Sequence, residues 1–377
     1  MVAVNSLSQE FQLSTYNIDE RLSNGLIKAV ITDDIGFVWS ATDRGVIRFN
    51  GKEAVLFKDQ IPNGFAKAFW KKDDGQLLVL HDFGLESIRS NPDTVYFSKV
   101  VNGLPRDTDS TLYYPKSIFE DSRGVLWIGE NQAVIKYAGG KLKKYRFGPE
   151  DFADSFYKGF SVAEDHSGII WAISFNGNLY RYDTSLDQFI PVQLSEEIVE
   201  AGSIDNMREN IFWVGAENGL FEIRIKDNKT VGHCRKIDGP GNILCTLHID
   251  NKEFYIGTSG DGLLRADISK DNPTFTQLDI LPFNDITSLH YDKNGIWVSS
   301  SENIALLHPV FFERANNSGT DHISSLKLNE DGTIYATADN YIFQLEKRDN
   351  QWYQKVVMEN FDVYPMAVSR DEDFLWV

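Results

Sequence analysis

The chain repeats one pattern along its whole length, and this repetition constrains its fold more than any other feature. In one copy an apolar segment ends in an acidic turn, and Trp127 follows the turn glycine, Gly124, by three residues. This aromatic position or its substitute recurs at intervals of 38 to 49 residues, at Trp39, Leu78, Trp127, Trp171, Trp213, Tyr255, Trp297, Tyr335 and Trp376. A period near ~42 residues with several strands per copy is typical of β-propeller blades.

Each repeat contains four strand signals. Asp–Gly turns such as Asp121–Gly124 follow the first strand, because Asp bonds its own backbone and Gly accepts positive φ. The second strand is almost continuously apolar, as in Val125–Ile128, which predicts a strand buried on both faces. The fourth is more polar, as in Lys141–Phe147, which predicts a partly solvated edge. Because one blade cannot cover its own apolar faces, we expect the blades to stack into a ring.

Two outer-strand signals indicate where the ring closes. Residues 11–16 resemble an outer strand with no blade before it, and residues 310–315, just after Pro309, repeat this arrangement. We therefore expect strand 11–16 to pair with the blade that contains Trp297. The predicted fold is all-β: a seven-bladed propeller of four-stranded antiparallel blades over 11–309, with 310–377 as the first one and a half blades of a second propeller. The alternative is a single eight-bladed propeller that ends near residue 360.

The composition argues against several partners. The chain has 55 acidic and 37 basic residues, a net charge of −18, which disfavours nucleic acid and anionic membranes. Cys234 and Cys245 lack the spacing of a zinc site, so we expect buried free thiols, with a disulfide as the alternative. No apolar run reaches the ~20 residues of a membrane span, and no signal peptide opens the chain. Because the sequence stops inside a strand signal, we expect a piece of a longer protein.

The repeat resembles that of the two-component regulator propeller family. The shared pattern is acidic-x-x-Gly-apolar-apolar-Trp-apolar-Gly-Thr-x-x-Gly-apolar-x-Arg-apolar, and repeats one, three and four match it best. The segment Arg21–Val30 is similar to the family's Gly-Leu-Ser-x-x-x-Val lead-in, with Arg21 where the family has glycine. The resemblance spans essentially the whole chain.

This resemblance implies a place in a larger signalling protein. Such propellers form the extracytoplasmic, periplasmic sensor region of bacterial hybrid two-component proteins and sensor histidine kinases. In them two seven-bladed propellers precede a β-sandwich, a membrane span and a cytoplasmic output domain. The signal peptide and the kinase would lie outside this sequence, and a homodimer would form through the full-length sensor.

The sequence shows no catalytic or metal-binding constellation. The seven histidines are scattered without ligand spacing, and the Asp-rich turns lack the pattern of a calcium loop. We therefore expect those turns to be hairpins, and we predict no catalytic residue, no metal and no cofactor.

Irregular loops are the best indication of a ligand site, because a propeller varies in the loops on its faces. The connections 102–115 and 147–159 are long and hold aromatic residues beside carboxylates, a combination that suits sugars. We expect the turns between second and third strands to open on the same face. The candidates for ligand contact are Tyr113, Tyr114, Phe156, Tyr157, Asp43, Arg44, Glu130, Asn131, Phe175, Asn176, Glu217 and Asp261. The alternative is that the aromatics pin the loops and the turns are simply solvated.

These observations predict a sensing module that binds a small-molecule or oligosaccharide ligand and catalyses no reaction itself. One alternative is a propeller polysaccharide lyase or glycosidase, which would need paired acid and base groups. Another is a protein-interaction scaffold, which would present a flat apolar face.

Overall fold

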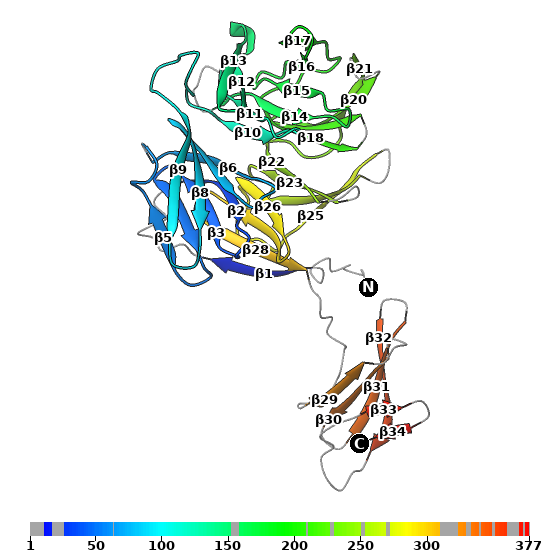
Figure 1. Ribbon diagram of the computed structural model, residues 1–377. Coiled ribbons are helices and arrows are strands. Elements are labelled where there is room, and N and C mark those ends of the chain that lie inside the picture. Colours follow the sequence, from blue (N-terminus) through cyan, green and yellow to red (C-terminus); the bar gives the residue numbers. More distant parts are fainter. Residues whose placement is uncertain are drawn as a thin grey trace. The chain divides into compact units, whose positions relative to one another are not determined.

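The computed structural model describes residues 11–16, 26–62, 64–151, 158–208, 210–226, 230–249, 253–268, 272–309, 323–328, 333–338, 341–348, 351–359, 369–371 and 374–376. The chain divides into two compact units, Met1–Pro309 and Val310–Val377. Apart from a 3-10 turn at Pro149–Asp151, the regular secondary structure of the described residues consists of β-strands (Figure 1). None of their helical segments is long and apolar enough to cross a membrane.

The described part of the first unit contains seven four-stranded antiparallel sheets. The first three consist of β2 (Ile27–Thr32), β3 (Val38–Thr42), β4 (Gly45–Phe49) and β5 (Ala54–Phe57); β6 (Ala66–Lys71), β7 (Leu77–His81), β8 (Gly84–Ser90) and β9 (Val95–Asn102); and β10 (Ser117–Glu120), β11 (Leu126–Gly129), β12 (Ala133–Ala138) and β13 (Lys141–Arg146). The next three consist of β14 (Ser161–Glu164), β15 (Ile170–Ile173), β16 (Leu179–Asp183) and β17 (Gln188–Val192); β18 (Ala201–Arg208), β19 (Ile211–Ala216), β20 (Gly219–Lys226) and β21 (Thr230–Ile237); and β22 (Ile243–His248), β23 (Glu253–Thr258), β24 (Leu263–Asp267) and β25 (Thr274–Gln277).

The seventh sheet joins the two ends of this unit. It contains β26 (Ser288–Asp292), β27 (Gly295–Ser299), β28 (Ile304–Pro309) and, beside β28, the N-terminal β1 (Phe11–Tyr16). The outer strand β1 runs antiparallel to β28, so that Phe11 pairs with Pro309 and Tyr16 pairs with Ile304. The predicted pairing of strand 11–16 with the sheet that contains Trp297 is therefore confirmed.

The sheets stand around a common centre. The first strand of each sheet contacts the first strand of the next, in the order β2, β6, β10, β14, β18, β22 and β26, and β26 contacts β2 again (Figure 1). The fold is thus a β-propeller, in which the first strands line the middle and the fourth strands face outward.

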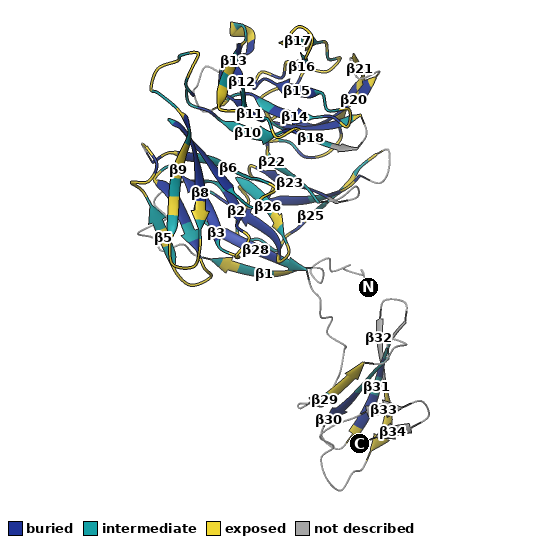
Figure 2. Ribbon diagram, in the orientation of Figure 1, coloured by how far each residue is buried: buried dark blue, intermediate teal, exposed yellow. Residues whose placement is uncertain are grey.

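Burial follows the predicted order of strands. The second strands β3, β7, β11, β15 and β27 are buried along their whole length, whereas the outer strands β13 and β17 consist mostly of half-buried and exposed residues (Figure 2). Neighbouring sheets share apolar clusters. For example, the ring centre of Trp171 lies 5.7 Å from that of Phe212 in the following sheet. At the closure, Tyr16 stacks on Trp297 at 5.7 Å and meets Phe49 edge-on at 5.2 Å.

The second unit contains one four-stranded sheet and one hairpin among its described residues. The sheet consists of β29 (Ile323–Leu328), β30 (Ile334–Ala338), β31 (Tyr341–Arg348) and β32 (Gln351–Glu359), and the hairpin of β33 (Ser369–Asp371) and β34 (Phe374–Trp376). The strand predicted at 310–315 lies outside the described residues. That 310–377 begin a second propeller stays a prediction.

Candidate functional site

A pocket of about 720 Å³ opens at the centre of the ring, on the face where the first strands begin. Its described lining comes from six of the seven sheets and their connections: Leu26, Ile27, Lys28, Phe65, Lys67, Asp82, Tyr114, Lys116, Lys158, Leu244, Thr287 and Ser301. Backbone hydrogen bonds fix these strand starts, such as Lys116 N to Gly129 O at 2.7 Å and Ile27 N to Ser301 O at 2.9 Å. Backbone hydrogen bonds therefore fix the edge of the pocket, and the side chains that line it come from distant repeats.

Four of the residues that line the pocket are lysines: Lys28, Lys67, Lys116 and Lys158. Lys67 forms an ion pair with Asp82. The ammonium groups of Lys67 and Lys116 each lie 5.6 Å from the centre of the Tyr114 ring, a distance at which the ring face attracts a cation. Tyr114 thus stands between two lysines that enter from different sheets.

Burial and mutual repulsion lower the pKa values of two of these lysines. Burial, together with the charge of Lys67, lowers the pKa of Lys28 below its ordinary value. Burial and the same neighbour lower the pKa of Lys116 to about 6. Nζ of Lys116 is buried and meets no hydrogen-bond acceptor among the described residues. A buried ammonium without an acceptor is costly, so the neutral amine is favoured at this position.

The turn after β7 places Asp82 at the pocket. His81 accepts a hydrogen bond from Phe83 N at Nδ1, 3.3 Å away, and its Nε2 contacts the buried carboxylate of Glu86. Asp82 N also donates to Phe65 O at 3.2 Å. These bonds hold the turn against the start of β6, where Phe65 and Lys67 emerge.

The carboxylate of Glu130 anchors the long connection 102–115. This buried carboxylate accepts hydrogen bonds from Tyr113 N at 2.6 Å and from Lys144 Nζ at 2.8 Å. Burial raises the pKa of Glu130, an effect that the Lys144 ammonium opposes. Tyr113 and Tyr114 meet edge-on at 5.0 Å, and Tyr114 has a positive φ of 46°. Glu130 thus acts within the protein as the anchor that presents Tyr114.

The other predicted contacts are dispersed. Asp43 and Arg44 line a separate depression of about 510 Å³ with Lys58 and Ile61. Phe175 is buried beneath the Lys158 ammonium, 5.4 Å from its ring centre. Asn131 is buried, and Asn176 donates from Nδ2 to Glu150 O at 2.9 Å.

Glu217 and Asp261 are exposed and do not line the central pocket as described. Phe156 and Tyr157 lie outside the described residues. Of the twelve candidates, the structure brings Tyr114 into the pocket and places Tyr113, Glu130 and Phe175 directly behind its lining.

The candidates predicted from the sequence did not include these lysines, although the sequence carries a signal for three of them. Lys28, Lys67 and Lys116 each stand eleven residues before the aromatic position of their repeat, which is Trp39, Leu78 and Trp127. The same offset before Tyr255 gives Leu244, another residue of the pocket. In these four repeats the position faces the centre, and in the first three it is lysine.

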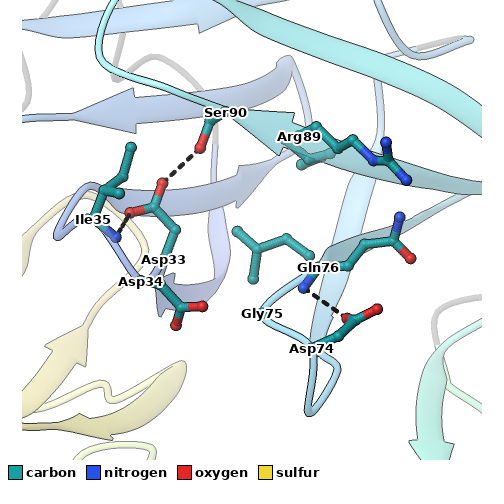
Figure 3. Close-up of a pocket in the computed structure, with 10 residues that line it drawn as sticks. Asp33, Asp34, Ile35, Asp74, Gly75, Gln76, Arg89 and Ser90 are labelled. Atoms are coloured by element: carbon teal, nitrogen blue, oxygen red, sulfur yellow. Dashed lines mark hydrogen bonds between the residues drawn. The ribbon is translucent and has the colours of Figure 1, made fainter.

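A second pocket, on the opposite face, has a structural explanation. It lies between the turn after β2 and the turn after β6, and Asp33, Asp74, Arg89 and Ser90 line it (Figure 3). Asp33 accepts hydrogen bonds from Ile35 N at 3.2 Å and from Ser90 Oγ at 2.9 Å (Figure 3). These carboxylates close hairpins, as the sequence predicted, and the described residues contain no group of side chains suited to a metal ion.

Comparison with known proteins identifies the fold. No family model matches the sequence, and no curated protein matches it. Among solved structures, the extracellular domain of a B. thetaiotaomicron protein described as a hybrid two-component system superposes with a TM-score of 0.60 at 16% identity. The match covers 98% of this chain and 50% of that one.

Propellers with other functions match equally well. Virginiamycin B lyase from Staphylococcus aureus gives a TM-score of 0.60 at 14% identity, covering 80% of this chain and 100% of the lyase. The WD40 propeller domain of Doa1 gives 0.57 at 14% identity over 82% of this chain and 100% of that domain. Since identities this low show the fold alone, the β-propeller is established, and its neighbours include both an extracellular domain of a two-component system and a lyase.

Proposed function

We propose that this chain is the ligand-sensing part of an extracytoplasmic signalling protein and that its ligand is a carbohydrate. The observation that carries the proposal is the central pocket, in which the aromatic rings of Tyr114 and Phe65 lie beside charged side chains from several sheets. Such a combination suits a sugar, because rings stack on its apolar faces while charged groups bond its hydroxyls. The pocket is formed by side chains of distant repeats, so a ligand would tie several blades together.

The place of this module in a larger protein is part of the same proposal. The repeat motif and the fold shared with a two-component extracellular domain support a periplasmic location, a homodimer through the full-length sensor, and a downstream output domain such as a histidine kinase. On this proposal the residues 310–377 begin a second propeller.

A glycan screen by calorimetry tests the proposal. We expect binding of at least one oligosaccharide, without product, and we expect Tyr114→Ala to weaken it about fivefold or more, since loss of one stacking ring is worth ~1–3 kcal/mol. Tyr96, exposed on the outer strand β9, offers the matched control Tyr96→Ala. Tyr157→Ala tests the second loop. Binding that survives both Tyr114→Ala and Tyr157→Ala removes these loops as the site.

A lyase is the second candidate, because one observation favours it. An amine with the lowered pKa of Lys116 can accept a proton at neutral pH, and Tyr114 stands beside it. In such an elimination Lys116 would take the proton from the carbon next to the carboxylate of an acidic sugar, the glycosidic C–O bond would break, and the leaving oxygen would take a proton from Tyr114 or water. The unsaturated product would absorb ultraviolet light. Appearance of that absorbance with any glycan would overturn the non-enzymatic proposal.

A further inference from the structure

The central pocket has the opposite charge to the chain as a whole. Acidic residues outnumber basic ones by 55 to 37, yet four lysines line this pocket and Asp82 is the single carboxylate among its described lining residues. The lysines come from four different sheets or their connections, so ring closure has brought them together. Repulsion among them opposes folding, and the described lining supplies too little negative charge to balance it.

The individual contacts show where an opposite charge is lacking. Lys67 is paired with Asp82, and the ammonium groups of Lys28 and Lys158 lie over aromatic rings, 5.0 Å from the centre of Phe65 and 5.4 Å from that of Phe175. Nζ of Lys116 is buried without a hydrogen-bond acceptor in the described structure. An anion placed here would receive hydrogen bonds and relieve the repulsion at once.

We propose that this pocket binds an anionic group, the carboxylate or sulfate ester of an acidic sugar, with Lys116 as its central partner and Lys67 and Lys28 beside it. The choice of a sugar as the carrier rests on the proposed function above. The pocket rim supports it, because Leu26, Phe65 and Leu244 are 55%, 38% and 37% exposed around the lysines. Apolar rim residues suit the ring of a sugar, and compact ammonium groups suit its anionic substituent.

Binding at this site is coupled to a proton. The charged and titratable groups facing Lys116 are Lys28 on β2, Lys67 on β6, Asp82 after β7 and Tyr114 on its own connection. Their combined effect and burial leave a pKa of about 6, so Lys116 is mostly neutral near pH 7. A bound anion favours the charged form and raises this pKa. The protein therefore takes up a proton on binding, and affinity rises as the pH falls from above neutral towards the free pKa of about 6.

Calorimetry with four probes tests the inference: an oligogalacturonate, a sulfated chondroitin oligosaccharide, an uncharged maltooligosaccharide and inorganic sulfate. We expect the acidic sugars to bind, more weakly as salt is added, and Lys116→Met to weaken binding about tenfold or more. Lys116→Arg keeps the charge at all pH values, so it should retain binding and lose the proton uptake, which is measured as the buffer dependence of the binding enthalpy. Lys141→Met, on the outer strand β13, is the matched control and should change neither the affinity nor the proton uptake.

The outcomes separate the two proposals. Binding of only the uncharged sugar, or acidic-sugar binding that is unchanged in Lys116→Met, overturns the anion site and leaves carbohydrate sensing standing. Binding of sulfate through Lys116 with none of the three sugars bound keeps the anion site and overturns the choice of an acidic sugar as its carrier. Binding of none of the four probes overturns the acidic-sugar inference, and the wider glycan screen then decides the proposed function.

Discussion

The indole Nε1 of Trp127 donates a hydrogen bond of 3.0 Å to Oδ2 of Asp121, the residue that closes the preceding turn. The other oxygen, Oδ1, accepts from Arg123 N at 3.0 Å and from Val125 N at 2.9 Å. One carboxylate therefore shapes the hairpin and orients the buried ring. Burial alone would raise the pKa of Asp121, but these hydrogen bonds lower it below its ordinary value. Equivalent hydrogen bonds run from the indole Nε1 of Trp39 to Asp33 at 2.9 Å and from that of Trp171 to Asp165 at 2.8 Å.

We predict that Trp127→Ala lowers the free energy of unfolding by roughly 3–5 kcal/mol, the usual cost of truncating a large buried aromatic. Trp127 is fully buried, stacks with Tyr145 and meets Tyr182 edge-on. Trp127→Phe keeps an aromatic ring and removes the donor to Asp121, so its cost should be smaller. Urea unfolding measures both. A cost below about 1 kcal/mol for the alanine variant would contradict a core role.

Removal of residues 1–17 should destabilise the whole ring rather than one blade. This deletion removes β1, exposes the edge of β28 and uncovers Trp297, on which Tyr16 stacks. Deletion of residues 1–10 leaves β1 in place and serves as the control. We expect a lower thermal midpoint only for the longer deletion. An unchanged unfolding curve after the longer deletion would show that the closure contributes little.

Lys116→Met should stabilise the protein without ligand. The folded pKa of Lys116, about 6, lies below the ordinary value of 10.5, so the unfolded chain binds more protons between these values and stability rises with pH there. At neutral pH, folding of the wild type must remove the proton from Lys116, which costs free energy. The Lys116→Met variant has no such cost. We expect the melting temperature to rise by about 2–4 °C near pH 7, as ~1 kcal/mol gives in a large domain, and the gain to shrink towards pH 10.5. A variant that melts below the wild type near pH 7 would refute this.

His290 should contribute acid sensitivity at the ring closure. Its Nε2 lies 3.0 Å from Thr32 Oγ1, which links β26 to β2. Burial lowers the pKa of His290 to about 4 from 6.5; Asp292 opposes this shift and Lys71 adds to it. The unfolded chain therefore binds more protons between these values, so the stability present above pH 6.5 is lost as the pH falls towards 4.

The measurement for His290 is the difference in unfolding free energy between about pH 7 and about pH 4.5 for the wild type and His290→Gln. The variant should lose part of the wild-type difference, at most ~3 kcal/mol, because one pKa unit corresponds to ~1.4 kcal/mol. Equal pH dependence in both proteins would exclude His290 as a source of the effect.

The sequence predicted the fold well because each blade is locally encoded. The apolar second strands, the Asp–Gly turns and the polar outer strands each recur within one repeat, and the outer strand expected at Lys141–Phe147 is found at Lys141–Arg146. The closing strand was also predictable, since residues 11–16 had an outer-strand pattern and no blade before them.

The site was predicted less well because it depends on contacts between repeats. Glu130 was expected to contact ligand, but its carboxylate is bonded to Tyr113 N and Lys144. Nothing in the local sequence around Glu130 indicates these partners. Lys28, Lys67 and Lys116 are far apart along the chain and meet only when the ring is closed. Their shared repeat position was the available signal.

The pairing of β1 with β28 has a consequence for the order of blades along the chain. Phe11 and Pro309 are register partners, so the two ends of the first unit already lie side by side. A short glycine linker from 309 to 11 would make the backbone circular without straining it. The chain could then be opened at Gly139–Gly140, the exposed turn between β12 and β13, where no neighbouring atoms crowd either glycine. Such a circular permutant would keep every strand pair of the ring, because the architecture does not require the polypeptide to start where it does.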